Sequence, residues 1–250
     1  MSLFPRPLKV VSERKSRAPQ VSVIVTLHNY AQYVEECLES IAAQTVADLE
    51  LIIVDDCSTD DGLKVVSAWI EQNAERFAAH ALIVHTTNMG LSYARNTAFL
   101  HASADRVFVM DADNALYARA VERCLEAMTQ SGAAGAYTQL EFFGERIGLG
   151  DADFWSKARF KPKNYVDAMA LISKDAWRAV GGYSQLIVDG WEDYDFWCKF
   201  VEHDLTCAFV PEVLCRYRTH SASMSTSKTN PNIGALILQM SLRHPWLELQ

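Results

Sequence analysis

Residues 21–26 read VSVIVT and residues 49–54 read LELIIV. Both are short apolar runs, rich in β-branched residues and bounded by polar residues, which is typical of buried strands. Between them, residues 30–44 carry apolar side chains at positions i, i+3, i+4 and i+7, the pattern of an amphipathic helix. Strand, helix and strand in this order predict an α/β fold built on a mainly parallel sheet.

The alternation continues through the first half of the chain. A helix is expected to end near residue 77, strands are expected at residues 82–85 and 106–110, and a helix should run through Arg95 after a turn at Gly90. The second half is less regular. There we expect helices at residues 117–128, 173–180 and 194–203, strands at 136–141, 167–172 and 207–210, a loop at 221–231 and a short C-terminal helix.

The composition is that of an ordinary globular protein, with 50% hydrophobic and 22% charged residues in a chain of 250. The formal net charge of −8 argues against a nucleic-acid-binding protein, which needs a basic surface. An acidic protein that binds an anionic substrate needs a source of positive charge, and a divalent cation would supply it. The six cysteines form no C-x-x-C pair, so a reducing compartment is the simpler interpretation.

Residues 1–19 are basic and lack the continuous apolar stretch of a signal peptide. We expect them to be a linker or the edge of a longer polypeptide. No apolar run approaches the ~18 residues of a membrane span. The sequence therefore favours a cytoplasmic location without a transmembrane segment, and peripheral contact with a membrane stays open.

Polar residues follow three of the predicted strands. Because the carboxyl ends of parallel strands meet at one edge of a sheet, where ligands bind, these residues should lie close together. They are Thr26, His28 and Asn29 after the first strand, Asp55 and Asp56 after the second, and Asp111, Asp113 and Asn114 after the strand at 106–110.

The pair Asp111 and Asp113 could bind Mn²⁺ or Mg²⁺, because both ions prefer oxygen ligands and Mg²⁺ is often shared between carboxylates and substrate phosphates. A turn in which Asp and Asn satisfy backbone donors would explain the same residues. Asp55 and Asp56 could accept hydrogen bonds from a nucleobase or a ribose, or could cap the following helix.

Two further stretches could serve the substrate. The turn at residues 88–90 begins a helix that contains Arg95, and helix N-termini and Arg both favour a diphosphate. Arg95 in a surface ion pair is the alternative. Asp193, beside Trp191 and Glu192, could bind an acceptor hydroxyl and take its proton, or could simply be a first-turn acid of a helix.

Together these stretches resemble glycosyltransferase family 2 enzymes with the GT-A fold. The resemblance spans about residues 21–225 and rests on VSVIVTLHNY, LIIVDDCSTDDG, NMGLSYARN, VFVMDADN, GGYSQLIVDGWEDYDFW and YRTHSASMS, in this order. It implies a Rossmann-like, mainly parallel central sheet flanked by helices, with a smaller acceptor-side subregion. The domain would cover residues 20–225, with a nucleotide-binding half at 20–114, an acceptor half at 115–225 and a helical tail at 226–250.

The resemblance implies a role for each matching residue. The base and ribose would be held by Thr26, His28, Asn29, Asp55 and Asp56, with Arg95 and Asp111 also on the nucleotide. The metal would be bound by Asp113, with Asp111 and His220 as further candidates, although a lone His after a strand is more often structural. Asp193 matches the catalytic base, with Trp191 and Glu192 on the acceptor side.

The function implied is metal-dependent, inverting transfer of a sugar from a nucleotide-sugar, most often a UDP-sugar, with Mn²⁺ or Mg²⁺ as the cofactor. The acceptor would be a carbohydrate, lipid-linked or protein hydroxyl, in polysaccharide or glycoconjugate biosynthesis. The absence of a Q-x-x-R-W motif and of membrane spans argues against a processive synthase. Trp155, Tyr165, Trp191 and Trp197 are candidate sugar-stacking surfaces, although such aromatic residues are more often core.

Three alternatives stay open. A sugar nucleotidyltransferase would favour a Gly-rich loop after the first strand, and VTLHNYAQ contains no Gly. A dinucleotide dehydrogenase would need a G-x-G-x-x-G motif after a strand, which is missing. A non-catalytic nucleotide-sugar-binding or assembly domain of a larger protein is less expected, because the D-x-D and Glu-Asp pairs are intact.

Overall fold

The computed structural model describes residues 8–221, 223 and 229–250. Its strands are β1 (Leu8–Lys15), β2 (Val21–Leu27), β3 (Leu49–Asp55), β4 (Ala79–His85), β5 (Arg106–Asp111), β6 (Ala115–Leu116), β7 (Gly135–Gly144), β8 (Gly148–Leu149), β9 (Ala170–Ser173) and β10 (Cys207–Thr219). Its α-helices are α1 (Val34–Ala42), α2 (Gly62–Asn73), α3 (Leu91–His101), α4 (Ala120–Ser131), α5 (Lys157–Phe160), α6 (Lys174–Ala179), α7 (Glu192–Glu202) and α8 (Ile233–Arg243). None of these helices is long and apolar enough to span a membrane.

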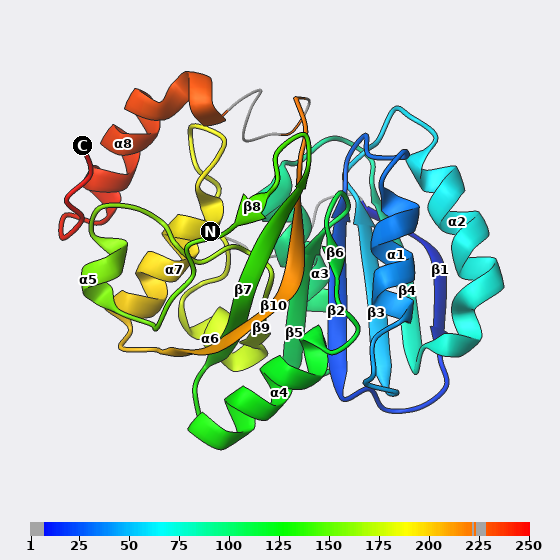
Figure 1. The fold of residues 1–250 in the computed structure, drawn as a ribbon. Helices are drawn as coiled ribbons and strands as arrows, with labels where there is room; N and C mark the ends of the chain where they lie inside the picture. Colours follow the sequence, from blue (N-terminus) through cyan, green and yellow to red (C-terminus); the bar gives the residue numbers. More distant parts are fainter. Residues whose placement is uncertain (1–7, 222, 224–228) are drawn as a thin grey trace.

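The strands form one sheet in the order β1-β4-β3-β2-β5-β9-β7-β10-β6, and β8 pairs with β7 (Figure 1). β4, β3, β2 and β5 are parallel neighbours, which confirms the predicted α/β fold with a mostly parallel sheet. From β2 the chain moves outward through β3 and β4 and then returns to β5 on the other side of β2. Such a reversal of strand order opens a crevice at the carboxyl ends of the strands. The predicted polar clusters therefore meet at one edge.

Helices cover both faces of this sheet, which explains why β2 and β3 are buried along their whole length. α1, α2 and α4 pack on one face, and α3, α6 and α7 on the other (Figure 1). Successive side chains of a strand point to opposite faces. Accordingly, Val23 and Val25 belong to the apolar cluster under α1, whereas Ile24 belongs to the cluster under α3.

Strand β10 is longer than the sequence predicts. We expected it to end before Pro211, but it continues to Thr219. A proline cannot donate a backbone hydrogen bond, so it is tolerated in strands only at edges or irregularities. The pairing of β10 with β7 shifts register between Val210 and Val213, so Pro211 falls within an irregularity. The extension carries β10 to the edge where the polar clusters lie.

Strand β1 was missed. Residues 8–15 lie in the segment that we expected to be a linker, yet they pair antiparallel with β4. The sequence LKVVSERK hides this strand because most of its side chains are exposed and several are charged, a composition common in edge strands. The domain boundaries at residues 20 and 225 stay a prediction.

A buried ionic cluster anchors α8 to α7. The Asp195 side chain is fully buried and accepts hydrogen bonds from Arg243 Nε at 2.6 Å and from His244 Nε2 at 3.0 Å. The other ring nitrogen of His244 lies 2.7 Å from Glu202 Oε1. Burial alone would raise the pKa of Asp195 and lower that of His244, but the hydrogen bonds outweigh it in both cases. The pKa of Asp195 is therefore lowered and that of His244 raised.

We expect His244→Gln to remove a pH-dependent part of the stability. His244 has a raised pKa in the folded protein, so its contribution is complete below its unfolded pKa of about 6.5 and is lost as the pH rises through the folded value. At pH 6 the variant should lose about 1–3 kcal/mol of unfolding free energy, because the carboxylates of Asp195 and Glu202 lose a partner. Urea unfolding at pH 6 and at pH 9 measures this. A loss of equal size at both values would contradict the ionic explanation.

Candidate active site

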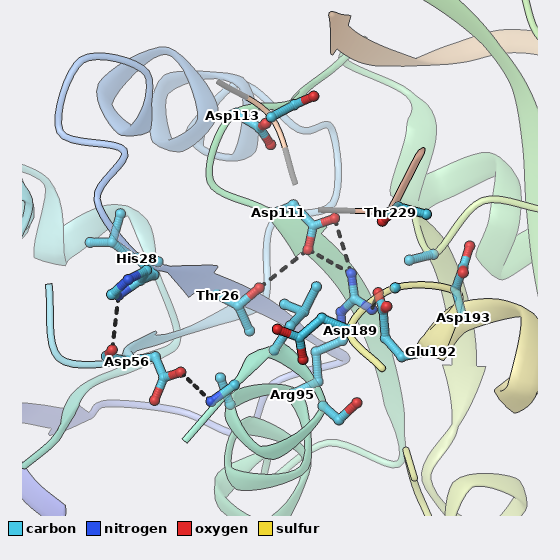
Figure 2. A pocket seen from close by; sticks show the side chains of 18 of the residues that line it. Thr26, His28, Asp56, Arg95, Asp111, Asp113, Asp189, Glu192, Asp193 and Thr229 are labelled. Carbon is cyan, nitrogen blue, oxygen red and sulfur yellow. Dashed lines mark hydrogen bonds and ion pairs between the residues drawn. The ribbon is translucent and has the colours of Figure 1, made fainter. Parts of the chain in front are cut away.

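A cavity of about 710 Å³ opens at the carboxyl ends of β2 and β5. It brings together residues of both halves of the chain (Figure 2). The nucleotide half contributes Thr26, His28, Asn29, Asp56, Arg95, Asp111 and Asp113, and the acceptor half contributes Trp191, Glu192 and Asp193. Nearly every residue singled out in the sequence therefore faces one space. Asp55 and His220 are not among its lining residues.

Arg95 is the electrostatic centre of this cavity. Its side chain is 1% exposed, which excludes the alternative of a surface ion pair. Nη2 donates to both carboxylate oxygens of Asp111, at 2.8 and 3.0 Å, and Nη1 donates to Glu192 Oε1 at 2.8 Å. Burial would lower the pKa of Arg95, but Asp111 and Glu192 outweigh it and hold that pKa above its usual value. Arg95 thus ties the end of β5 to the start of α7.

The D-x-D segment ends β5. Thr26 and Asp111 are register partners on β2 and β5, and the Thr26 hydroxyl donates to Asp111 Oδ1 at 3.2 Å. Asp113 points away from this pair (Figure 2), and its Oδ2 lies 3.1 Å from His220 Nε2. Burial, and then the charge of Asp111, raise the pKa of Asp113. The other ring nitrogen of His220 is buried and has no hydrogen-bond partner in the described part of the chain.

These donors fit part of a metal site. In the described ranges, no group of three or more His, Cys, Asp or Glu is arranged to hold an ion, so an ion bound here would also need ligands from a substrate or from water. A cation shared between one or two carboxylates and substrate phosphates needs no more than that. Both oxygens of Asp111 already accept hydrogen bonds from Arg95. Asp113 is therefore the better placed ligand, and His220 could orient its carboxylate.

Strand β10 holds this segment in place. The Arg218 backbone N–H donates to Asn114 Oδ1 at 2.9 Å, and its Nε donates to the Asp113 carbonyl oxygen at 2.9 Å. The guanidinium also lies over the Tyr33 ring, with its carbon 4.8 Å from the ring centroid. The unpredicted extension of β10 thus orders the D-x-D segment. A strand assumed to end at Pro211 could not reveal this contact.

Asp56 holds the loop that begins α3. Its Oδ1 accepts a hydrogen bond from the Met89 N–H at 2.8 Å, and its Oδ2 accepts one from the Gly90 N–H at 2.7 Å. His85 Nδ1 lies 2.7 Å from Oδ1 and must donate, because a carboxylate at this distance accepts. The carboxylate has about four lone-pair sites. His85, Met89 and Gly90 use three of them, so the carboxylate could still accept one hydrogen bond from a nucleotide.

Asp55 lies away from the cavity and contacts the segment that follows it. Its side chain is 1% exposed, does not line the cavity and accepts hydrogen bonds from the backbone N–H and the hydroxyl of Ser58. Consecutive residues of a strand point to opposite sides. Only one of the two adjacent aspartates can therefore face the cavity, and it is Asp56.

His28 and Asn29 shape the rim of the cavity. His28 Nδ1 lies 3.0 Å from the Asp56 carbonyl oxygen, so this nitrogen carries the proton and Nε2 is free to accept from the Asn88 side chain at 3.0 Å. Asn29 has a left-handed backbone, with φ of 58°, and its side-chain oxygen accepts from the Thr59 N–H at 2.7 Å. Both residues line the cavity and also fix the loop that carries them.

Asp193 lies on the opposite side of the cavity from Asp56 (Figure 2). The chain reaches it through two left-handed residues, Gly190 with φ of 113° and Trp191 with φ of 59°. A side chain at Gly190 would place its Cβ 2.5 Å from Thr229 Oγ1, so the glycine is required here. Asp193 Oδ2 accepts a hydrogen bond from the Asn164 side chain at 2.8 Å.

The electrostatics around Asp193 make it a stronger proton acceptor than an ordinary carboxylate. Burial, followed by the charges of Glu192 and Asp167, raises the pKa of Asp193 well above its usual value, and Arg95 partly offsets this. Burial also raises the pKa of Asp167 to about 7. A carboxylate with a raised pKa holds a proton more strongly, and proton transfer is most efficient when the pKa of the base lies near the working pH.

Asn164, Asp167 and Asp189 also line the cavity and were missed in the sequence. Asp167 precedes β9, and β9 runs antiparallel to β5. The start of β9 therefore lies at the same edge as the end of β5. Pairing direction cannot be read from a single apolar run. Of the four candidate stacking aromatics, Tyr165 and Trp197 are core, and Trp191 lines the cavity. The ring centroid of Trp155 lies 5.9 Å from that of Trp197.

A mostly parallel sheet with a D-x-D segment at its carboxyl edge, facing a carboxylate in the second half of the chain, is the arrangement of a GT-A glycosyltransferase domain. The family model for glycosyl transferase family 2 matches residues 22–174, more than half of the chain. The chain belongs to this family.

Two of the curated relatives are much longer than this chain. It is 28% identical over 201 residues to a chondroitin synthase of Escherichia coli, which covers 78% of the chain and 28% of the relative. It is also 28% identical over 206 residues to a hyaluronan synthase of Pasteurella multocida, which covers 80% of the chain and 20% of the relative. The chain thus corresponds to a fraction of these enzymes.

Solved structures share the fold. S. aureus TarS 1–349 in complex with UDP-GlcNAc superposes with a TM-score of 0.69 at 17% identity, over 83% of this chain and 61% of that one. The mannosyltransferase PcManGT from Pyrobaculum calidifontis, in complex with GDP-Man and Mn²⁺, gives a TM-score of 0.67 at 20% identity. This match covers 95% of this chain and 67% of PcManGT. At these sequence identities, the similarity shows only that the fold is shared.

Proposed function

We propose that this domain transfers a sugar from a nucleotide-sugar to a hydroxyl group, with inversion at the anomeric carbon and with Mn²⁺ or Mg²⁺ as the cofactor. One observation carries the proposal. A single cavity joins the Asp111–Asp113 segment at the end of β5 to Asp193 at the start of α7. The first is suited to the charged diphosphate end of a donor, and the second to proton removal from an acceptor.

The donor would lie in the nucleotide half. Asp56 and His28 are available to the base and ribose, and Asp113 would hold the cation beside the diphosphate. The bound cation would supply positive charge against the leaving group. We propose a UDP-sugar, as TarS binds UDP-GlcNAc, and the GDP-Man bound by PcManGT makes a GDP-sugar the alternative to test.

Asp193 would take the proton of the acceptor hydroxyl as that oxygen attacks the anomeric carbon. Attack from the face opposite the leaving diphosphate inverts the configuration, so an α-linked donor gives a β-linked product. Arg95 supports this geometry because it neutralises Asp111 and Glu192 at once. Asn164 would keep the Asp193 carboxylate aimed at the cavity.

The setting would be polysaccharide or glycoconjugate biosynthesis, as the names of the two synthase relatives suggest. We propose a cytoplasmic location. All six cysteines are among the described residues and are free thiols, which suits a reducing compartment.

A thermal-shift screen of UDP-, GDP- and dTDP-sugars with and without Mn²⁺ tests this proposal. A donor at about 100 times its Kd stabilises the native state by about 2.7 kcal/mol. For a domain of this size each kcal/mol raises Tm by roughly 2–4 °C. We expect the sugar donor of one nucleotide to raise Tm in the presence of Mn²⁺. The variant Asp113→Asn should lose the part of this Tm increase that depends on Mn²⁺.

Two other outcomes would count against catalysis. If none of the donors raises Tm with Mn²⁺, the domain does not bind a nucleotide-sugar. If a donor binds but is neither transferred nor hydrolysed, a binding or assembly domain is the better description.

A further inference from the structure

A second cavity, of about 620 Å³, adjoins the candidate active site. Asn164, Asp167, Asp193 and Tyr217 line both cavities, so the two meet at the proposed base. The second cavity extends from there along the β7–β8 hairpin and β10. Its volume lies within the range of ~300–1,000 Å³ typical of small-molecule sites. A molecule in it would present one end to Asp193.

The inner end of this cavity is suited to hydroxyl groups. Asp167 and Asp193 offer carboxyl oxygens, and Asn164 adds an amide group that donates to Asp193 Oδ2. Burial already disfavours the charged form of both carboxyls. A carboxylate or phosphate placed beside them would itself have to be ionised in a partly dry site that disfavours negative charge, which is unfavourable. Uncharged hydroxyls, in contrast, can donate to them.

The outer part combines aromatic rings with balanced charges. Phe142 and Tyr217 pack edge to face with their centroids 5.8 Å apart, and the Arg146 guanidinium carbon lies 4.1 Å from the Phe142 centroid. Asp151 is paired with Lys163 at the rim. Glu145 stands next to Arg146. Among the described residues that line the cavity, Arg146 is the only guanidinium group and Glu145 and Asp151 are the outer acids, so no net positive charge attracts an anion.

We propose that this cavity is the acceptor subsite and that it takes an uncharged saccharide of at least two rings. The reacting sugar lies against Asp193 and Asp167, and the next sugar packs the C–H face of its ring against Phe142 and Tyr217. The inference rests on the proposed function and adds to it the class of acceptor. It excludes acceptors that end in a uronic acid or a phosphate.

The test compares acceptors after a donor has been found. Neutral disaccharides (cellobiose, maltose, lactose and diacetylchitobiose) are assayed beside their monosaccharides and their uronic-acid derivatives. We expect at least one neutral disaccharide to be used with a kcat/KM at least about tenfold above both its monosaccharide and its uronic-acid derivative. Use of a uronic-acid derivative at least as well overturns the proposal, as does equal use of a monosaccharide.

Variants localise the effect. Phe142→Ala should raise the KM of the disaccharide about tenfold and leave the KM of the donor unchanged, whereas Phe154→Ala, an exposed phenylalanine outside both cavities, should change neither. Arg146→Met should retain most of the activity on the neutral acceptor. A loss of that activity to the level of Asp193→Asn would show that the guanidinium is essential and overturn the proposal.

Failure of this inference differs from failure of the proposed function. If donor binding and slow donor hydrolysis are present but no neutral disaccharide is used, the acceptor class is wrong and the glycosyltransferase assignment stands. If no donor binds, both the acceptor class and the proposed function are wrong.

Discussion

Asp193→Asn should lower kcat by about 10²–10⁴-fold, the range that general-base assistance typically supplies. The amide keeps the shape of the carboxyl and can still contact Asn164, but it cannot take a proton. Donor affinity should stay within about twofold, because Asp193 lies across the cavity from Asp56 (Figure 2). Steady-state rates and calorimetric titration with the donor measure the two quantities separately.

The pH dependence of kcat/KM distinguishes a base from a residue that is only structural, because loss of a structural side chain would not change this pH dependence. Burial, Glu192 and Asp167 raise the pKa of Asp193, so kcat/KM of the native enzyme should fall as the pH drops through that raised value. The residual activity of Asp193→Asn should lack this acidic limb. Asp175→Asn, in an exposed first-turn ion pair of α6, is the matched control and should behave as the native protein. Turnover of Asp193→Asn near the native rate would remove Asp193 from the role of base.

Arg95→Met should lower the free energy of unfolding by about 3–5 kcal/mol, the cost of removing one partner of a buried ion pair. The substitution would leave Asp111 and Glu192 without their shared cation while the long side chain still fills the space. Denaturant unfolding at neutral pH measures the loss, and its decrease at lower pH, where carboxyls are protonated, would confirm the electrostatic cause.

Arg178→Met is the matched control for this experiment. Arg178 pairs with Asp175 across one turn of α6, and both side chains are more than half exposed. Exposed pairs of this kind contribute about 0–1 kcal/mol. Arg95→Met combined with Glu192→Gln should recover part of the loss, because one of the two unpaired charges is removed. Equal losses in Arg95→Met and Arg178→Met would contradict the central role given to Arg95.

Much of the parallel core could be predicted from the sequence, because β2, β3 and β5 are continuous apolar runs that end in polar residues. The positions of Thr26, Asp56 and Asp111 followed from this pattern. The acceptor half was harder. β9 lies antiparallel beside β5, and only that pairing brings Asp167 to the cavity. β10 passes an internal proline, so its contacts with Asp113 and Asn114 could not be expected from a strand that seemed to stop there.

The sequence alone also could not show which of two adjacent residues makes which contact. Asp55 and Asp56 are chemically identical neighbours, and only the direction of each side chain decides that Asp56 holds the loop of Met89 and Gly90 while Asp55 holds Ser58. Likewise, the sequence left a diphosphate contact and a surface ion pair open for Arg95, and only its enclosure by β5 and α7 excludes the second.

Strand β1 has a consequence for handling the protein. Its partner β4 reads AHALIVH, and without β1 this apolar strand would become the open edge of the sheet. An open edge of this kind offers unpaired N–H and C=O groups to other molecules and promotes aggregation. The charged side chains of β1 shield that edge. Expression from residue 20 onward would therefore give a poorly soluble protein, and the segment from residue 8 should be retained for crystallisation and assay.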